Sequence, residues 1–374
     1  MSRLYPAVDP QGLLEFSVVY TDRALNHMSA AFQAVMRDIA GTLKRAYGAQ
    51  AAIVVPGGGT YAMEAVARQF AADRRCLVIR NGWFSYRWSQ ILEMGRIPAA
   101  LTVLKARPVA AGARAAFAPA PIDTVVATIR AERPAVVFAP HVETAAGMLL
   151  PDDYLRALAE AAHAVDALFV LDCIASGALW LDMRALGVDV LISAPQKSWS
   201  APACAGLVML GARARERIDA TTSSSFACDL RKWLQIMEAY ENGGHAYHAT
   251  MPTDALARVR DMMRESERDG LDTLRARQQE LGRRVRTLLE RKGYASVAAS
   301  GFQAPGVVVS YTDDPELQSA RKLLPRGLQI AAGVPLQCDE PADFRTFRIG
   351  LFGLDKLRNI DETVHHLQVA FDGV

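Results

Sequence analysis

Short apolar runs alternate with helical patterns over the first two thirds of the chain. A run of four to six apolar residues between turn residues is typical of a buried strand, whereas apolar residues three and four apart mark one face of a helix. Helical spacing occurs at Met63, Val66, Ala67 and Phe70. The expected strands are 51–55, 76–79, 135–139, 167–171 and 189–192. This alternation predicts an α/β fold: a mainly parallel sheet with helices on both faces.

The pattern changes near residue 265. Residues 264–293 form one long, charged, amphipathic stretch, which we predict to be a helix leading into a second, smaller unit. Two strand-like runs and a terminal amphipathic helix follow, at 306–311, 346–351 and 360–371. A chain of this length is expected to form about two domains. We predict an N-terminal segment, a large α/β domain and a small α+β domain, at 1–22, 23–265 and 266–374.

Charge and hydropathy narrow the choice of partners. Lysine and arginine total 42 against 40 acidic residues, and the basic residues are scattered along the chain. The sequence therefore shows no cluster of basic residues of the kind that binds nucleic acid or an anionic membrane. No stretch approaches the roughly 18 apolar residues that span a bilayer, and the N-terminus lacks the apolar core of a signal peptide. We expect a cytoplasmic protein that acts on small molecules.

The five cysteines are isolated from one another and from histidine, so neither a disulfide framework nor a zinc site is expected. Each is predicted to be a small buried residue; they are Cys76, Cys173, Cys204, Cys228 and Cys338. No metal site is predicted.

Ligands of open parallel sheets sit outside the carboxyl ends of the strands, so the residues after each apolar run were compared. The first run is followed by "PGGGTYAMEAV", in which glycines and Thr60 precede a helix. Unpaired amides at a helix start favour a phosphate, although an ordinary turn with Thr60 as the cap fits equally well. The second run is followed by "RNGWFSYRW", whose aromatic residues either stack on a planar ligand or pack in the core.

The later strand ends carry titratable side chains. The third run leads into "PHVETAAG", which places His141, Glu143 and Thr144 in a loop. Asp172 directly follows the fourth run, where a buried carboxylate needs a partner such as a protonated ring nitrogen, an arginine or backbone amides. The fifth run leads to "SAPQKSW" and Lys197. An anion cradle, a stacking ring, a buried acid and a desolvated lysine are together what pyridoxal 5'-phosphate requires.

With these motifs the chain resembles the class V, fold-type I, pyridoxal-phosphate-dependent aminotransferases, the group of alanine–glyoxylate and serine–pyruvate aminotransferases. The resemblance runs from residue 40 to residue 355. It rests on an ordered set of motifs: "PGGGTYAMEA", "NGWFSYRW", "HVETAAG", "LDCIASG", "SAPQKSWSAPACAGL", "SSFACDLRKW", "YHATMP" and "TFRIGLFG". It implies a seven-stranded-type sheet and a smaller C-terminal domain.

The resemblance also implies roles for single residues. Lys197 would form the Schiff base, Asp172 would pair with the pyridine nitrogen, Phe84 would stack on the ring, and Thr144 would hydrogen-bond near the ring oxygen. The phosphate would be bound by Gly59, Thr60 and Gln196, and by Tyr247 and Thr250 from the second subunit of a homodimer. Arg348 would hold the substrate carboxylate as a bidentate pair.

The implied reaction transfers an amino group from a small amino acid, such as alanine or serine, to a 2-oxo acid such as glyoxylate or pyruvate. It would run as two half-reactions in a ping-pong order, with Lys197 moving the Cα proton. Several departures leave the substrate open. Ser85 stands where glycine is usual, "AAG" replaces "STG" at 145–147, the turn before Arg348 is not glycine-rich, and the usual N-terminal "PGP" has no clear counterpart.

Three alternatives remain open from the sequence. A class V lyase or desulfurase would keep the cofactor and need a mobile catalytic cysteine, for which Cys338 is the only candidate expected in a loop. A nucleotide-dependent oxidoreductase would use "GGGTYA" as a dinucleotide turn, but the run lacks the G-x-G-x-x-G spacing. A non-catalytic regulator would keep only the fold.

Overall fold

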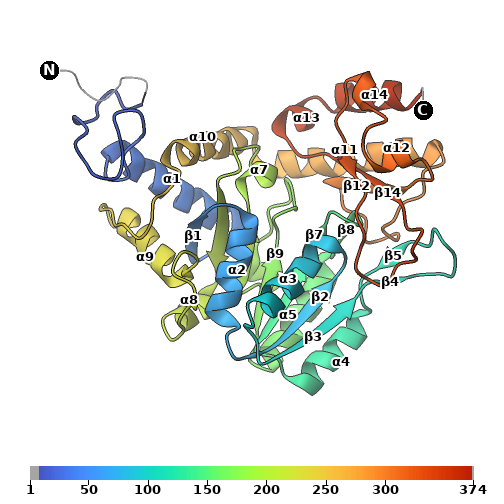
Figure 1. The fold of residues 1–374 in the computed structure, drawn as a ribbon, viewed down its shortest axis with the longest axis horizontal. Helices are drawn as coiled ribbons and strands as arrows, with labels where there is room; N and C mark the ends of the chain where they lie inside the picture. The colour runs from blue at the N-terminus through green and yellow to red at the C-terminus, as the bar shows by residue number, and fades with distance from the viewer. Residues whose placement is uncertain (1–7, 373–374) are drawn as a thin grey trace.

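The computed structural model describes residues 8–372, so residues 1–7 of the predicted N-terminal segment lie outside the described part. A large sheet forms the centre of the molecule (Figure 1). Its strands are β1 Ala51–Pro56, β2 Arg75–Arg80, β3 Ala100–Lys105, β6 Val136–Pro140, β9 Leu168–Asp172, β10 Val190–Ser193 and β11 Ala205–Leu210. They lie side by side in the order β1-β11-β10-β9-β6-β2-β3.

The prediction of a mainly parallel sheet is confirmed. Strands β3, β2, β6, β9 and β10 run parallel, and β11 runs antiparallel to both of its neighbours. The connection from β10 to β11, residues 194–204, is too short for the crossover that a parallel neighbour needs, so the chain turns back on itself. Strands β3 and β11 were not among the five runs expected from the sequence.

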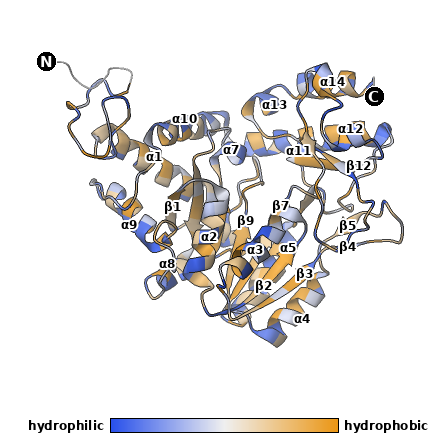
Figure 2. Cartoon of the chain, viewed as in Figure 1, coloured by the Kyte–Doolittle hydropathy of each residue, from blue (hydrophilic) through white to orange (hydrophobic). Residues whose placement is uncertain are grey.

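Ten helices precede residue 270 in the described chain: α1 Ala30–Tyr47, α2 Gly59–Phe70, α3 Trp83–Met94, α4 Ile122–Glu132, α5 Asp152–Ala164, α6 Met183–Leu186, α7 Pro195–Ser198, α8 Ala212–Ile218, α9 Leu230–Glu241 and α10 Thr253–Asp269. Helix α2 packs on β10 and β11, α3 on β2 and β6, α5 on β9, and α1 with α9 on β1. Because helices cover the sheet, β6 and β9 are buried along their whole length, and β9 is coloured as hydrophobic in Figure 2.

The C-terminal part forms a second, antiparallel sheet in the order β12-β14-β13. Its strands are β12 Val307–Tyr311, β13 Ala331–Ala332 and β14 Thr346–Gly350. Its helical segments are α11 Leu271–Arg291, α12 Pro315–Gln318, the 3-10 turn η1 Leu324–Arg326, α13 Leu354–Arg358 and α14 Ile360–Asp372. Two short hairpins complete the fold: β4 Arg107–Pro108 with β5 Phe117–Ala118, and β7 Val142–Glu143 with β8 Met148–Leu149.

The single helix predicted over 264–293 is wrong. Helix α10 ends at Asp269 and α11 begins at Leu271. Gly270 between them has φ 86°, a left-handed conformation that glycine adopts without steric cost. The charged pattern continues through both helices, so only this glycine marks the break.

A second apolar cluster joins the β7–β8 hairpin to the C-terminal sheet. Its buried members include Val142, Met148 and Val309. The partly buried rings of Trp83, Phe84, Phe344 and Phe352 pack against it. This cluster fixes the C-terminal sheet over the carboxyl ends of the large sheet's strands. Within residues 8–372, no helix is both long enough and apolar enough to cross a membrane.

Candidate active site

The register of three parallel strands brings the predicted site residues together. Asp172, the last residue of β9, pairs with Pro140 of β6 and with Ile192 of β10. The segments that leave these strands therefore meet at one edge of the sheet. A cavity at this edge is lined by Gly59, Thr60, Met63, Phe84, Arg87, Val142, Thr144, Asp172, Ile174, Ala175, Gln196 and Lys197.

Lys197 lies on the short helix α7, which begins with Pro195. Its Nζ is 5.9 Å from the ring centroid of Phe84 and 5.7 Å from that of Phe352. Burial lowers the pKa of the Lys197 ammonium; the negative charge of Asp172 opposes this, and the positive charge of Arg348 adds to it. The amine is thereby made easier to deprotonate than an exposed lysine.

Asp172 is only 8% exposed. Its Oδ1 accepts a hydrogen bond from the backbone N–H of Ile174 at 2.9 Å. Burial raises the pKa of the Asp172 carboxyl to about 6, against the opposing effects of the Ile174 hydrogen bond and the Lys197 charge. In the described chain no lysine or arginine forms a salt bridge with this carboxylate.

The start of α2 forms another wall of the pocket. Its N-cap residue is Gly58, which provides no side-chain hydrogen bond to the first turn, so the first amides of the helix have no partner from a capping side chain. Gly59 lies close to Ile174: a Cβ at position 59 would be 2.6 Å from Cδ1 of Ile174, so the Ile174 side chain would have to shift. Thr60 Oγ1 accepts a hydrogen bond from Arg87 Nη1 at 2.9 Å.

Phe84 stands in the first turn of α3 with three cations around its ring. The guanidinium carbons of Arg87 and Arg348 each lie 5.4 Å from the ring centroid, in addition to Lys197 Nζ. Arg348 comes from β14, the central strand of the C-terminal sheet, and its Nε donates to the Ala332 carbonyl at 2.7 Å. Burial lowers the pKa of the Arg348 guanidinium, and the charge of Glu143 opposes this.

Glu143 was seen in the sequence without a role. Its side chain is fully buried and accepts hydrogen bonds from Ser85 N at 2.8 Å and Ser85 Oγ at 2.7 Å. It also accepts from Ala145 N at 2.9 Å and Phe84 N at 3.3 Å. Glu143 therefore serves as the missing side-chain cap of α3 and holds Phe84 beside Thr144. Gly82, at the N-cap position of α3, has no side chain that could accept a hydrogen bond from the first turn. This glycine is the signal in the sequence that could have suggested an acceptor from another element.

Three predicted site residues are not among those that line this cavity: Arg348, whose guanidinium lies beside the Phe84 ring, Tyr247 and Thr250. Tyr247 and Thr250 follow α9, and the Tyr247 hydroxyl is 3.1 Å from Thr250 Oγ1. Tyr247 is 54% exposed, and neither residue lines the pocket.

His141, quoted with the same motif as Thr144, is also outside the lining. It is buried, its Nδ1 lies 2.7 Å from Ser176 Oγ, and burial lowers the pKa of the imidazole to about 3. It is therefore a neutral structural histidine.

Cys338, the candidate cysteine of the desulfurase alternative, lies in a loop between β13 and β14, as expected. It is only 3% exposed, and its Sγ contacts the carbonyl oxygen of Arg80 at 3.4 Å. Burial raises the pKa of this thiol to about 12, so a thiolate nucleophile is disfavoured. All five cysteines are buried and free, as predicted. Among the described residues, no group of three or more His, Cys, Asp or Glu side chains is arranged to hold a metal ion.

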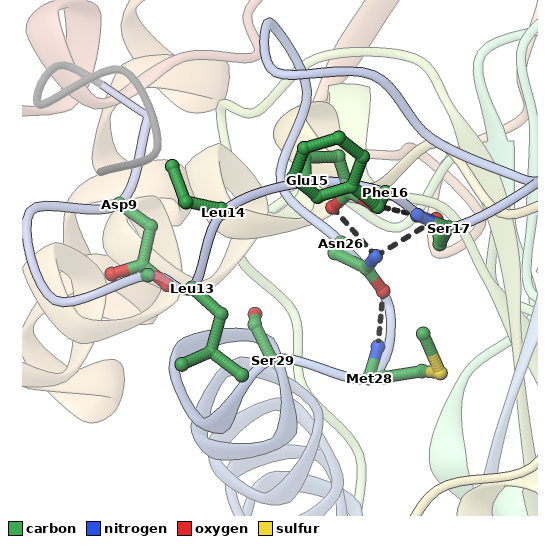
Figure 3. A pocket seen from close by; sticks show the side chains of 10 residues that line it. Asp9, Leu13, Leu14, Glu15, Phe16, Ser17, Asn26, Met28 and Ser29 are labelled. Carbon is green, nitrogen blue, oxygen red and sulfur yellow. Dashed lines mark hydrogen bonds between the residues drawn. The ribbon is translucent and has the colours of Figure 1, made fainter. Parts of the chain in front are cut away.

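A different cavity lies under the N-terminal segment, between residues 9 and 29 (Figure 3). Its polar groups bond to each other: Asn26 Nδ2 donates to Glu15 Oε2 at 2.7 Å and to Ser17 Oγ at 3.2 Å. The rest of the lining includes Leu13 and Phe16. No basic side chain lines it, so it lacks the combination of a buried acid and a buried amine that lines the Lys197 cavity.

Comparisons with known proteins agree with the geometry. The family described as aminotransferase class-V matches residues 13–344. A 2-aminoethylphosphonate–pyruvate transaminase of Paraburkholderia phymatum is 29% identical over 89% of this chain and 84% of its own length. Alanine–glyoxylate aminotransferase 1 of Saccharomyces cerevisiae is 26% identical over 66% of each chain. The crystal structure of an alanine–glyoxylate aminotransferase from Nostoc sp. has the same fold, with a TM-score of 0.78 at 21% identity, covering 99% of this chain and 93% of that one.

Proposed function

The chain belongs to the class V aminotransferase family, and on that premise we propose that it transfers an amino group from a small amino acid to a 2-oxo acid, using pyridoxal 5'-phosphate held at Lys197. The donor would resemble alanine or serine, and the acceptor glyoxylate or pyruvate. The observation that carries the proposal is the meeting of Lys197, Asp172 and Phe84 with the start of α2 in one cavity.

The charges of the pocket fit such a cofactor. Lys197, Arg87 and Arg348 surround the Phe84 ring, and none of them forms a salt bridge with a carboxylate in residues 8–372. Three basic side chains that form no salt bridge favour a bound phosphate and a bound carboxylate. Asp172 is buried and forms no salt bridge within residues 8–372, which favours a protonated ring nitrogen beside it.

The residues that would hold the cofactor are those to which the family resemblance gives this role and which line the cavity. The Lys197 amine would bind its aldehyde, and Phe84 would lie against its ring. Thr144 would hydrogen-bond near the ring oxygen, and Gly59, Thr60 and Gln196 would bind the phosphate. When bound, pyridoxal 5'-phosphate supplies an aldehyde that takes up the substrate's amino group and a ring that accepts electron density from its Cα.

The chain supplies the proton chemistry. Lys197 Nζ, with its pKa lowered by burial, takes the proton from the substrate Cα. Asp172 is ionised above about pH 6 and keeps a proton on the ring nitrogen. Arg348 would orient the substrate by binding its carboxylate, since its guanidinium reaches from the C-terminal sheet to 5.4 Å from the centroid of the Phe84 ring, which lines the pocket.

A homodimer would complete the site. Tyr247 is exposed, and within residues 8–372 its hydroxyl bonds only to Thr250, so both hydroxyls are available to a neighbouring subunit's phosphate. Leu13, Phe16 and Val18 of the N-terminal segment are also largely exposed, which favours a protein partner. We infer that the second subunit covers this face and receives Tyr247 and Thr250.

A second donor is favoured by the comparison with the transaminase of P. phymatum, which acts on 2-aminoethylphosphonate. Arg348 would bind a phosphonate in place of the carboxylate. The carboxylate is planar and the phosphonate is tetrahedral, but each offers two oxygens that accept paired N–H bonds from one guanidinium. A screen of amino donors, followed by absorbance of the cofactor and by product analysis, separates alanine, serine and 2-aminoethylphosphonate.

Borohydride reduction followed by peptide mapping tests the proposal itself. A pyridoxyl group should be found on Lys197, and Lys197→Ala should lose the visible absorbance and nearly all turnover. Label at another lysine, or a yellow and active Lys197→Ala variant, would refute the assignment. Release of sulfide or persulfide from cysteine by the wild type would instead support the lyase or desulfurase alternative.

A further inference from the structure

Arg87 is the charged side chain of the pocket to which neither the family motifs nor the proposed function gives a role. It lies three residues after Phe84 on α3, and therefore on the same face of the helix. Its Nη1 donates to Thr60 Oγ1 at 2.9 Å, and its guanidinium lies 5.4 Å from the Phe84 ring centroid. Arg87 lines the same cavity as Lys197 and Asp172.

The guanidinium of Arg87 is not neutralised by a direct ion pair in the part of the chain that the structure describes. No carboxylate forms a salt bridge with it in the described chain, and its one hydrogen bond is to a neutral hydroxyl. Arg68 on α2 offers a contrast, because it also donates to a hydroxyl, Ser224 Oγ at 2.9 Å, but is paired with Glu64 at 2.7 Å. A half-buried cation without a counter-ion is stabilised when an anion binds beside it.

The position of Arg87 indicates which anion this is. Thr60 stands at the start of α2, where the first amides lack a side-chain cap. The Thr60 hydroxyl accepts one N–H from Arg87, which leaves its own proton to donate elsewhere. Arg87, Thr60 and the helix start thus present charged and neutral donors to one place.

We propose that Arg87 binds the phosphate group of the cofactor directly, beside Gly59 and Thr60. This inference rests on the proposed function, because it requires pyridoxal 5'-phosphate in the Lys197 pocket. The planar fork of arginine matches two phosphate oxygens. Arg87 would give each subunit a positively charged phosphate-binding residue of its own, independent of Tyr247 and Thr250 from the second subunit.

The competing role for Arg87 is to support the Phe84 ring alone. The two roles differ in one measurable respect. If Arg87 binds the phosphate, it raises the affinity only for aldehydes that carry a phosphate. If Arg87 supports the Phe84 ring, it raises the affinity equally for pyridoxal, which has the same ring and no phosphate.

The test titrates cofactor-free full-length protein with pyridoxal 5'-phosphate and, separately, with pyridoxal, following the absorbance of the aldehyde bound at Lys197. Arg87→Met should weaken binding of pyridoxal 5'-phosphate by about 10- to 100-fold, the usual effect of losing a charge-assisted hydrogen bond. Its affinity for pyridoxal should change by less than about threefold. Arg87→Lys, which keeps the charge and loses the fork, should recover part of the affinity. Arg68→Met is the matched control and should leave both affinities unchanged.

Competition by inorganic phosphate gives a second readout. Phosphate should compete with pyridoxal 5'-phosphate for the wild type and compete about tenfold less well for Arg87→Met. Equal losses for the two aldehydes, or no loss for either, would overturn the assignment of Arg87 while leaving the proposed function intact. A wild type that binds neither aldehyde would overturn the proposed function and this inference with it.

Discussion

Two titratable groups in the pocket respond to the same burial in opposite directions. Burial disfavours the charged form of any side chain, so it lowers the pKa of the Lys197 ammonium and raises that of the Asp172 carboxyl. Both groups are therefore moved toward neutral pH, where a group can hold or release a proton with little cost. Groups with such shifts are typical of sites that perform acid–base chemistry.

The shift at Asp172 predicts a pH dependence of stability in the cofactor-free protein. The folded pKa is about 6 and the ordinary value is 3.8, so the folded state binds this proton more tightly than the unfolded state. The resulting stabilisation is present below pH 3.8 and is lost as pH rises to about 6. The free energy of unfolding should change by at most about 3 kcal/mol over this pH range.

Asp172→Asn removes this titrating group. In the variant, the free energy of unfolding should therefore depend less on pH in this range. Urea unfolding of the cofactor-free wild type and variant at a series of pH values measures it. Asp22→Asn, at an exposed position, is the control and should keep the wild-type slope. Parallel profiles for the wild type and Asp172→Asn would contradict the shift.

The hydrogen bonds of Ser85 give a structural reason for a serine at a position where the family usually has glycine. The Ser85 hydroxyl donates to Glu143 and accepts from the backbone N–H groups of Asn81 and Gly82. Ser85→Ala should lower the free energy of unfolding by about 1–3 kcal/mol, because it leaves buried groups without partners. Urea unfolding measures this, and Ser319→Ala, at an exposed serine, should cost far less. Equal costs at the two sites would show that the Ser85 hydroxyl is unimportant.

At the scale of elements, the site depends on how closely α2 approaches β11. A Cβ at Gly206 of β11 would lie 2.3 Å from Cβ of Ala62 and 2.8 Å from the Gly58 carbonyl oxygen. The glycine lets the helix start lie against the strand. The contact thereby places Gly59 and Thr60 at the edge of the pocket.

Gly206→Ala should therefore affect the fold and the pocket together. We expect a loss of about 1–3 kcal/mol in the free energy of unfolding, because backbone atoms must move to admit the methyl group. The affinity for pyridoxal 5'-phosphate should fall as well, since α2 carries part of the phosphate site. Unfolding and cofactor titration measure the two effects. Gly244→Ala, where the nearest atom to the new Cβ is 3.5 Å away, should change neither; a well-tolerated Gly206→Ala would show that α2 can shift freely.

At the scale of the whole molecule, the apolar surface of the N-terminal segment lacks a partner within the described chain. Phe16 is 88% exposed and Val18 is fully exposed. The segment is tied to the region of Tyr247, because the Tyr20 hydroxyl donates to the Met251 carbonyl and the His27 ring lies 5.5 Å from the Tyr247 ring. One surface thus contains both the apolar residues and the hydroxyls proposed to reach a second subunit.

This arrangement predicts that the double substitution Phe16→Ser and Val18→Ser shifts the protein from dimer toward monomer. The apolar side chains would no longer be removed from water at the interface, so association weakens. Sedimentation velocity measures the mass, and Val369→Ser, at an exposed valine of α14, is the control. A wild type that sediments as a monomer, or a variant that dimerises as well as the control, would refute the interface.

The local pattern of the sequence was enough for much of the fold. Five apolar runs became strands because a strand buried on both faces must be apolar along its length. It was not enough for β3, a half-buried edge strand, or for the break at Gly270, where charge and periodicity continue unchanged. These features depend on what lies beside the segment, which the segment itself does not encode.

By itself, the sequence determined the fold class, the aminotransferase family and the strand ends at which chemistry was to be expected. Those strand ends converge because the β6, β9 and β10 register is set by parallel pairing. Only the tertiary structure decided that Glu143 caps α3 and that Arg87 contacts Thr60. Each of these contacts joins residues from different elements, and their distance and burial follow from packing across the sheet rather than from local spacing.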